Sequence, residues 1–139
     1  MDSKQRRVVI VLLAIGCLVG LGLTALAWES ARGPRDAATV MVRVNDADGK
    51  VLHEGAVHLA PGSNDVLSAL RALGTGQGFA VETQEFGGLG KMVVAISGIH
   101  NQGSCGWVYE VNKQSGDRAA DLWRLSDNDQ VEWSWACHA

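Results

Sequence analysis

In this chain of 139 residues, the side chains most able to bind a metal or form a covalent bond are those of Cys105, Cys137 and His138. Thiolates and imidazoles bind metals, and two thiols can also form a disulfide. The spacing of these three residues does not match known zinc sites, and no Cys-x-x-Cys-His haem signature occurs. We therefore predict no metal site and favour a Cys105–Cys137 disulfide. Two free thiols, or a metal site that uses Cys137, His138 and in one version Cys105, stay open as alternatives.

Aromatic residues gather in the same region, where a ligand could stack on them. Four of the five tryptophans lie between the two cysteines. Residues 105–112 and 131–137 both alternate apolar and polar side chains with period two, which is typical of half-buried strands. This pattern predicts that Trp107, Tyr109, Trp133 and Trp135 face the core. Trp123 lies outside the pattern and is predicted to be the exposed aromatic that contacts a ligand or a partner.

An antiparallel pairing of these two strands has one register that sets cysteine against cysteine. The same register places Trp107 opposite Trp135, Tyr109 opposite Trp133, Val111 opposite Val131, and Glu110 opposite Glu132. Two opposed carboxylates destabilise a sheet, yet they could act as an acid–base pair or hold a cation weakly. On the solvent face of an open sheet we interpret them as tolerated charges. Because no Ser/His/Asp set or metal signature occurs, we predict a protein that is not an enzyme and has no catalytic residues.

The polar loop before the first aromatic strand is a second candidate site. It contains His100, Asn101 and Gln102. Loops on a rigid sheet often carry binding residues, so we predict a ligand site made of these three residues and Trp123. The alternative is an ordinary solvated turn.

The N-terminus predicts the compartment. Val8 to Trp28 carries no charge and follows Lys4, Arg6 and Arg7; as a helix it would span about 32 Å, enough for a bilayer core. We predict a single-pass anchor with a cytoplasmic N-terminus and an extracytoplasmic domain. A signal peptide cleaved after Ala27 and a lipid anchor at Cys17 are the alternatives. Each exports the rest of the chain, where disulfides persist.

The exported part shows no sign of nucleic-acid binding. Residues 29–139 have a formal charge of −5 and no basic patch, which argues against nucleic acid as a partner. Residues 1–28 form the predicted anchor or signal and residues 29–38 a linker. Residues 39–139 are enough for one small domain with its own core.

The remaining elements follow from hydrophobic periodicity and turn residues. Strands are predicted at 39–45, 51–59, 79–86 and 92–99, with a hairpin turn at 87–90. A helix is predicted after Ser63 or Asn64 as N-cap, with Val66, Ala69, Leu70 and Leu73 as its apolar stripe and Gly74 as its end. The predicted fold class is α+β: a β-grasp-like mixed or antiparallel sheet with one short helix on one face, preceded by the transmembrane helix.

Several of these segments together resemble a known family. The segments are Gly49-Lys50-Val51-Leu52, Val66 to Arg71, Ile96-Ser97-Gly98-Ile99, Gly106-Trp107-Val108-Tyr109-Glu110-Val111-Asn112, Ala119-Ala120-Asp121 and Asp129 to Trp133. They are similar to the transcobalamin C-terminal-like domain of the soluble-ligand-binding β-grasp group, over most of residues 40–135. Asn128 departs from that pattern, which has glycine there, but asparagine tolerates the same left-handed backbone.

The resemblance implies a binding or adaptor role. In eukaryotic cobalamin carriers the related domain closes over the corrinoid together with a larger helical domain, whereas many bacterial relatives have no assigned activity. The resulting hypothesis is an exported, membrane-anchored small-molecule-binding module, accessory to uptake. Cobalamin is its candidate ligand, which His100 could bind axially, and no cofactor is certain. The alternative is a non-catalytic structural or protein-interaction domain at the cell surface with a membrane-associated protein partner.

Overall fold

The structure, a computed structural model, describes residues 37–138, which belong to one compact unit. The predicted membrane segment Val8–Trp28, cleavage after Ala27, the Cys17 anchor and most of the 29–38 linker lie outside the described residues. Within 37–138 we find no helix that is long and apolar enough to cross a membrane. The described elements are β1 (Ala38–Asn45), β2 (Val51–Leu59), α2 (Val66–Gln77), β3 (Val81–Glu85), η1 (Gly87–Leu89), β4 (Lys91–Ile96), β5 (Ile99–His100), β6 (Cys105–Val111), β7 (Gln114–Ser115) and β8 (Gln130–Cys137).

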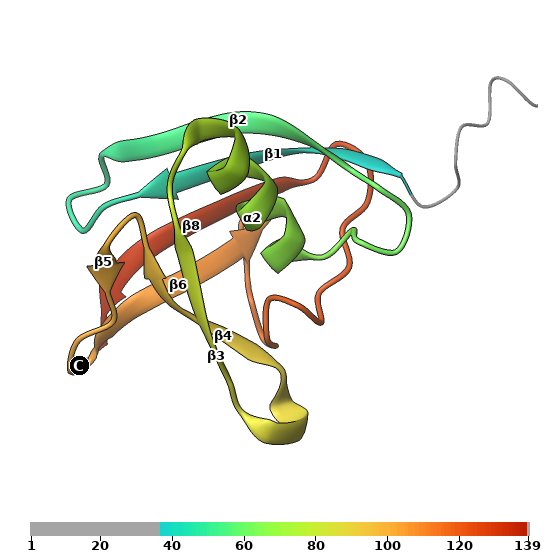
Figure 1. Ribbon diagram of the computed structural model, residues 1–139. Coiled ribbons are helices and arrows are strands. Elements are labelled where there is room, and N and C mark those ends of the chain that lie inside the picture. Colours follow the sequence, from blue (N-terminus) through green and yellow to red (C-terminus); the bar gives the residue numbers. More distant parts are fainter. Residues whose placement is uncertain (1–36, 139) are drawn as a thin grey trace, which may run out of the picture. The chain divides into compact units, whose positions relative to one another are not determined.

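A mixed five-stranded sheet forms the main layer (Figure 1), with strand order β2-β1-β8-β6-β7. β1 and β8 run parallel at its centre, and the neighbouring pairs are antiparallel. Every second residue of β1 faces the core, so Val40, Val42 and Val44 are almost completely buried. This combination of a mixed sheet and one helix confirms the predicted α+β class.

The register predicted for the two aromatic strands is confirmed. Cys105 pairs with Cys137, Trp107 with Trp135, Tyr109 with Trp133, Glu110 with Glu132 and Val111 with Val131. Trp107, Tyr109 and Trp133 are buried, and Trp135 packs against the core as a half-buried residue. Parity along each strand therefore placed the aromatic side chains on the correct face.

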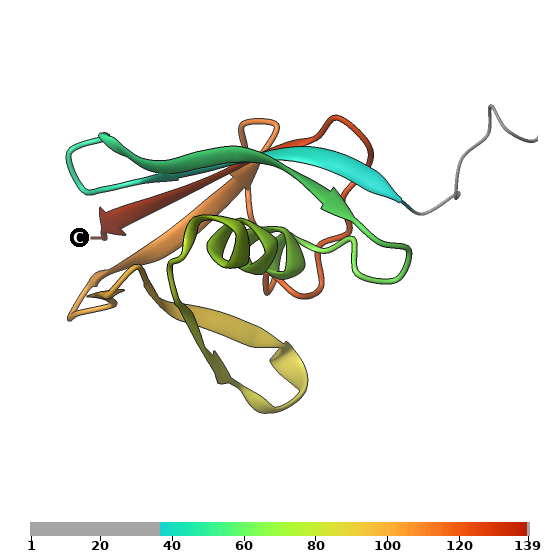
Figure 2. The same ribbon diagram turned by 45° about the horizontal axis from the view of Figure 1, so that its top comes forward.

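Helix α2 covers one face of this sheet. Figure 2 shows it between the large sheet and the β3–β4 hairpin. Its buried residues Val66, Ala69, Leu70 and Leu73 are those of the predicted apolar stripe. They meet the valines of β1 and the aromatic residues of β6 and β8 in one core cluster.

Both ends of the helix differ from the prediction. The N-cap is Asp65 rather than Ser63 or Asn64, because its carboxylate accepts the backbone N–H of Ser68 at 2.8 Å. The helix also runs past Gly74 to Gln77 and ends at Gly78, which has φ +80°. Gly74 has a packing role instead, since an added Cβ there would lie 2.7 Å from the carbonyl oxygen of Phe79.

Removal of the Asp65 carboxylate should destabilise the domain. Asp65 is 8 % exposed and also accepts a hydrogen bond from the Ser68 hydroxyl at 2.8 Å. We expect Asp65→Ala to lower the free energy of unfolding by about 1–2 kcal/mol, measured by urea denaturation. Asp65→Asn keeps an N-cap acceptor and should cost less than half of that; an equal loss would contradict the capping role.

A second, smaller sheet, β3-β4-β5, crosses below the helix. The predicted strand 79–86 is shorter, at Val81–Glu85, and the predicted strand 92–99 is divided into β4 and β5 by a turn at Ser97 and Gly98, both with positive φ. Gly87–Leu89 forms the predicted hairpin turn as one 3-10 turn. Asn128 has φ +67°, the left-handed conformation expected for it.

Candidate functional site

A pocket of about 470 Å³ opens where the β3–β4 hairpin passes β6. β4 supplies one wall, Trp107, Val108 and Tyr109 of β6 supply another, and the loop 116–120 closes a third side. The volume falls within the range of small-molecule sites, and mostly apolar walls are typical of them. The pocket is therefore the candidate functional site.

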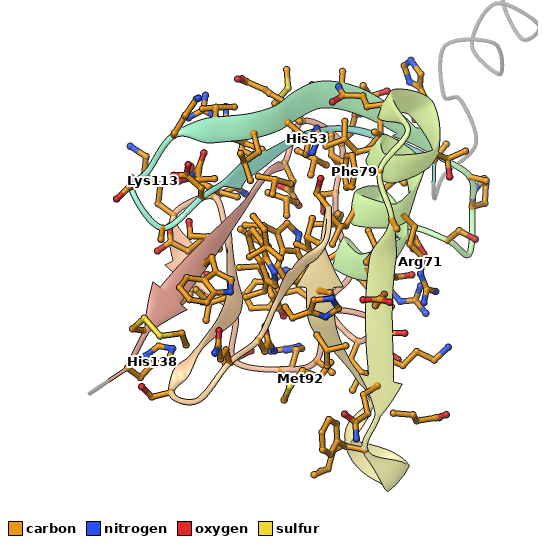
Figure 3. The ribbon with its side chains drawn as sticks, turned by 60° about the vertical axis from the view of Figure 1, so that its left-hand side comes forward. His53, Arg71, Phe79, Met92, Lys113 and His138 are labelled. Atoms are coloured by element: carbon orange, nitrogen blue, oxygen red, sulfur yellow. A yellow bond between two sulfur atoms is a disulfide. The ribbon has the colours of Figure 1, made fainter. Side chains whose placement is uncertain are left out.

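Exposed apolar side chains surround the mouth of the pocket. Phe86 is 43 % exposed, Leu89 79 % and Met92 50 %, and all three line the pocket; Met92 is labelled in Figure 3. Large side chains left in water on one rim commonly mark a binding surface. Gly90, with φ +94°, lets the hairpin tip lie close to Ala119 and Asp121, because any side chain there would overlap them. The rim is thereby held next to the 116–120 loop.

Trp133 contributes an unused hydrogen-bond donor. Its side chain is 2 % exposed and lines the pocket. The indole Nε1–H is buried and has no hydrogen-bond partner among residues 37–138. Because a buried donor without an acceptor costs about 1–3 kcal/mol, a ligand oxygen that reached it would remove that cost.

Tyr109 is fixed in the wall of the pocket. Its hydroxyl donates to the backbone oxygen of Arg118 at 2.6 Å, and Gly116 lies so close to its ring that a side chain there would overlap it. Burial, together with the nearby Asp117 carboxylate, raises the pKa of Tyr109 to about 12. Tyr109 therefore acts as a hydrogen-bond donor and apolar wall at neutral pH, not as a base.

The Tyr109 pKa predicts alkaline unfolding. The folded pKa of about 12 exceeds the ordinary value of 10.0, so the protonated form favours folding. This stabilisation is complete below pH 10 and is lost as the pH rises from 10 towards 12. Tyr109 is the only tyrosine of the chain, so absorbance at the phenolate band reports it alone. We expect no phenolate near pH 10.5 in the folded protein, and half-ionisation there would contradict the prediction.

Charged side chains sit at one end of the pocket. Arg118 Nε and Asp117 Oδ1 are 2.9 Å apart, and this contact lowers the pKa of the Asp117 carboxyl. The Arg118 guanidinium also lies 5.0 Å from the centre of the Trp123 ring. Lys91 lines the pocket as well, and no carboxylate of residues 37–138 pairs with it. The Lys91 ammonium therefore forms no ion pair within residues 37–138, although the Asp121 carboxylate lies 3.0 Å from its backbone nitrogen.

The residues predicted from the sequence as ligand contacts lie elsewhere. His100 is exposed and its Nδ1 is 3.5 Å from Glu82 Oε2. Asn101 uses its side-chain amide on Val93 O and Trp107 N, and Gln102 forms a backbone bridge with Cys105. Trp123 is half-buried, with its ring edge-on to Tyr109 at 6.0 Å. None of the four lines the pocket, and their role in binding stays a prediction.

The disulfide Cys105–Cys137 is present at the end of the large sheet, close to His138 (Figure 3). Both sulfur atoms belong to this bond, so neither cysteine is a free thiol in the structure. Across residues 37–138 no group of three His, Cys, Asp or Glu side chains gathers around a common point. Glu110 and Glu132 do oppose each other, and Glu132 accepts a hydrogen bond from Asn45 Nδ2 at 2.9 Å while Arg43 lies 3.9 Å away.

The sequence interpretation considered Trp107, Tyr109 and Trp133 as a possible stacking surface but missed the other residues of the pocket. Phe86, Leu89 and Met92 surround the glycine-rich turn that was interpreted only as a hairpin. Apolar residues on both sides of an exposed turn are unusual, because turns are commonly polar. That pattern was the available signal for a binding rim.

Solved structures with a similar fold include two with differing descriptions. Haptocorrin in complex with Cbi matches with a TM-score of 0.57 and 12 % identity, over 77 % of this chain and 27 % of that one. A protein from Ruminococcus gnavus, provisionally described as metal-binding, matches with a TM-score of 0.54 and 14 % identity, over 73 % of this chain and 99 % of that one. At these identities the likeness is one of fold, and it supports the predicted transcobalamin-like fold.

Comparison at the level of sequence gives the family. No curated protein matches the chain. A family model described as a domain of unknown function, DUF4430, matches residues 63–136, which include α2, the hairpin, the pocket and both aromatic strands. This match covers more than half of the 139 residues, so the chain belongs to the DUF4430 family.

Proposed function

We propose that the domain is an exported small-molecule-binding module, accessory to uptake, held at the membrane by the segment Val8–Trp28. The observation that carries the proposal is the mostly apolar pocket of about 470 Å³, whose lining includes Trp133, a residue with a buried Nε1–H that has no partner within residues 37–138. The ligand binds there through apolar contact and offers an oxygen to Trp133. Lys91 favours a ligand with negative charge or strong acceptors at the mouth.

A corrinoid is the first candidate ligand. The resemblance to the transcobalamin C-terminal-like domain and the fold shared with haptocorrin, whose structure contains Cbi, support this choice. A corrinoid is larger than the pocket, so one edge of the ring would enter while the rest lies over Phe86, Leu89 and Met92. In that placement the ligand would cover the exposed apolar side chains of the rim and remove them from water.

The test is equilibrium dialysis of the full chain, in detergent micelles, against cobinamide and cobalamin. We expect saturable binding at micromolar corrinoid. Met92→Glu places a charge on the rim and should weaken binding about tenfold, the cost of about 1.4 kcal/mol that a charged rim imposes on an apolar ligand. Met41→Glu is the matched control, because Met41 is 41 % exposed and no residue of its strand, β1, lines the pocket. Absence of saturable binding would exclude the corrinoid.

The same assay decides between the pocket and the sequence-predicted site. If the ligand lies in the pocket, His100→Ala and Gln102→Ala leave affinity within twofold while Met92→Glu lowers it. If His100 binds the corrinoid axially, His100→Ala instead abolishes the absorbance change that axial imidazole produces. The latter outcome would transfer the proposed site to the 100–102 loop.

A further inference from the structure

The pocket is bordered by two strand edges whose hydrogen-bonding groups are partly unused. On the β4 side, Lys91 N–H donates to Asp121 Oδ1 at 3.0 Å and Val93 C=O accepts from Asn101 Nδ2 at 3.2 Å. In an antiparallel strand the N–H and C=O of one residue point to the same side. Lys91 C=O and Val93 N–H therefore also point away from β3, and within residues 37–138 neither group bonds to the backbone of a turn, loop or cap.

β6 has the matching pattern on its own edge. Trp107 N–H donates to Asn101 Oδ1 at 2.9 Å, and Tyr109 C=O accepts from Gly116 N–H at 2.9 Å. By the same rule, Trp107 C=O and Tyr109 N–H face away from β8, and in the described part of the chain neither group bonds to the backbone of a turn, loop or cap. Lys91, Val93, Trp107 and Tyr109 all line the pocket.

Asn101 shows what fits between these edges. Its side-chain amide gives its N–H to β4, at Val93, and receives an N–H from β6, at Trp107. A peptide unit of an inserted strand would do the same, with its two groups on opposite sides. In an extended chain the next unit is reversed, so its C=O would meet Val93 N–H and its N–H would meet Trp107 C=O. The unit after that would meet Lys91 C=O and Tyr109 N–H. Two successive peptide units thus match all four free groups.

We propose that the pocket binds an extended peptide segment of a partner protein, inserted as a strand between β4 and β6. The segment carries an apolar residue that packs on Trp133 and the rim of Phe86, Leu89 and Met92, and an acidic residue next to Lys91, the pocket cation without an ion pair within residues 37–138. Main-chain hydrogen bonds provide affinity in such strand addition and side-chain pockets provide selectivity. The proposal shares the pocket with the proposed function but does not require a corrinoid.

The test uses a random heptapeptide library displayed on phage and selected on the full chain in nanodiscs, after depletion on empty nanodiscs. The best peptide is then synthesised with a single N-methyl group at each position in turn. We expect loss of affinity of about tenfold or more at two adjacent positions, since each methyl removes one paired N–H, and little change elsewhere. A flat N-methyl scan, or no enrichment over empty nanodiscs, would overturn the proposal.

Two further measurements keep the result independent of misfolding. Amide signals of Val93 and Tyr109 in NMR spectra of the wild-type chain should shift downfield when peptide binds, because their N–H groups gain acceptors; unchanged signals would overturn the proposal. Met92→Glu should lower the affinity for the peptide, and Met41→Glu should leave that affinity unchanged. Corrinoid binding without peptide binding would uphold the proposed function and reject strand insertion, whereas the reverse outcome would reject only the corrinoid.

Discussion

Replacement of Trp133 by alanine should lower the free energy of unfolding by about 3–5 kcal/mol, the usual cost of removing a buried aromatic side chain. Trp133 is the largest of the fully buried side chains, at 2 % exposure. Its ring centroid lies 5.2 Å from that of Tyr109 across the β6–β8 pair, and it joins the core cluster that contains α2. A cavity there would leave both the sheet and the helix without a contact. Urea denaturation followed by far-ultraviolet circular dichroism measures the loss.

The matched variant is Trp133→Phe, which retains an aromatic ring and removes the indole Nε1–H. Because that N–H has no partner among residues 37–138, its removal forfeits no hydrogen bond and relieves a buried donor. Phenylalanine is smaller than tryptophan by three heavy atoms, so a small cavity remains; we expect a cost of about 1–2 kcal/mol, less than half that of Trp133→Ala. If Trp133→Phe lowered the free energy of unfolding as much as Trp133→Ala does, the indole N–H would already have a hydrogen-bond partner in the protein. A ligand acceptor for that N–H would then be contradicted.

The same two variants separate stability from binding. Trp133→Phe keeps the fold and removes the donor that the proposed ligand satisfies. Affinity should then fall by the value of one hydrogen bond, about 0.5–1.5 kcal/mol, while the protein stays folded. A variant that lost affinity only in proportion to its stability would show that Trp133 supports the pocket without touching the ligand.

The register of β6 and β8 was predictable from two features: the alternation of apolar and polar side chains, and the need to set Cys105 opposite Cys137. A slip of β6 by one residue would turn Trp107 and Tyr109 to the solvent face while Trp133 stayed in the core. A slip of two would separate Cys105 from Cys137. Only one register satisfies both conditions, so the sequence contains enough information to define it. The repulsion between the opposed carboxylates of Glu110 and Glu132 is reduced by two residues of β1. Asn45 donates a hydrogen bond to Glu132, and Arg43 lies beside Glu132 as a counter-charge.

The helix start shows where local signals become ambiguous. Ser63, Asn64 and Asp65 are all good N-cap residues, and a distant segment decides between them. Asn64 is used elsewhere: its Oδ1 accepts from Arg124 and its Nδ2 donates to the backbone oxygen of Leu125. Asp65 is therefore left to cap α2. The outcome depends on residues 60 positions away, which no local pattern contains.

The pocket was unpredictable for a related reason. Its walls come from the hairpin 86–92, from β6 and from the loop 116–120, and these meet only after the chain has folded. Composition can suggest that Phe86 and Leu89 are unusual near a turn, but not which surface they approach. Sequence patterns therefore predicted a fold and a disulfide, while the site required the packing of segments distant in sequence.

Loss of the Cys105–Cys137 disulfide should also cause a large decrease in the free energy of unfolding. The bridge closes a loop with a sequence separation of 32 residues, for which restriction of the unfolded chain predicts a stabilisation of about 3–4 kcal/mol. We expect Cys105→Ser/Cys137→Ser, made in a Cys17→Ser background, to lose about this amount in urea denaturation. Reduction of the parent should give the same loss, and dithiothreitol should not affect the double variant.

A thiol titration tests the bond itself in the Cys17→Ser background, where only Cys105 and Cys137 remain. The unfolded, unreduced protein should show no free thiol and the reduced protein two; two free thiols before reduction would contradict the bridge. The bond also holds the end of β6 next to Asn101, whose amide links β6 to β4. Because that link stands at one end of the pocket, reduction should weaken ligand binding as well as stability. If affinity were unchanged after reduction, the pocket would be organised by the hairpin and the 116–120 loop alone.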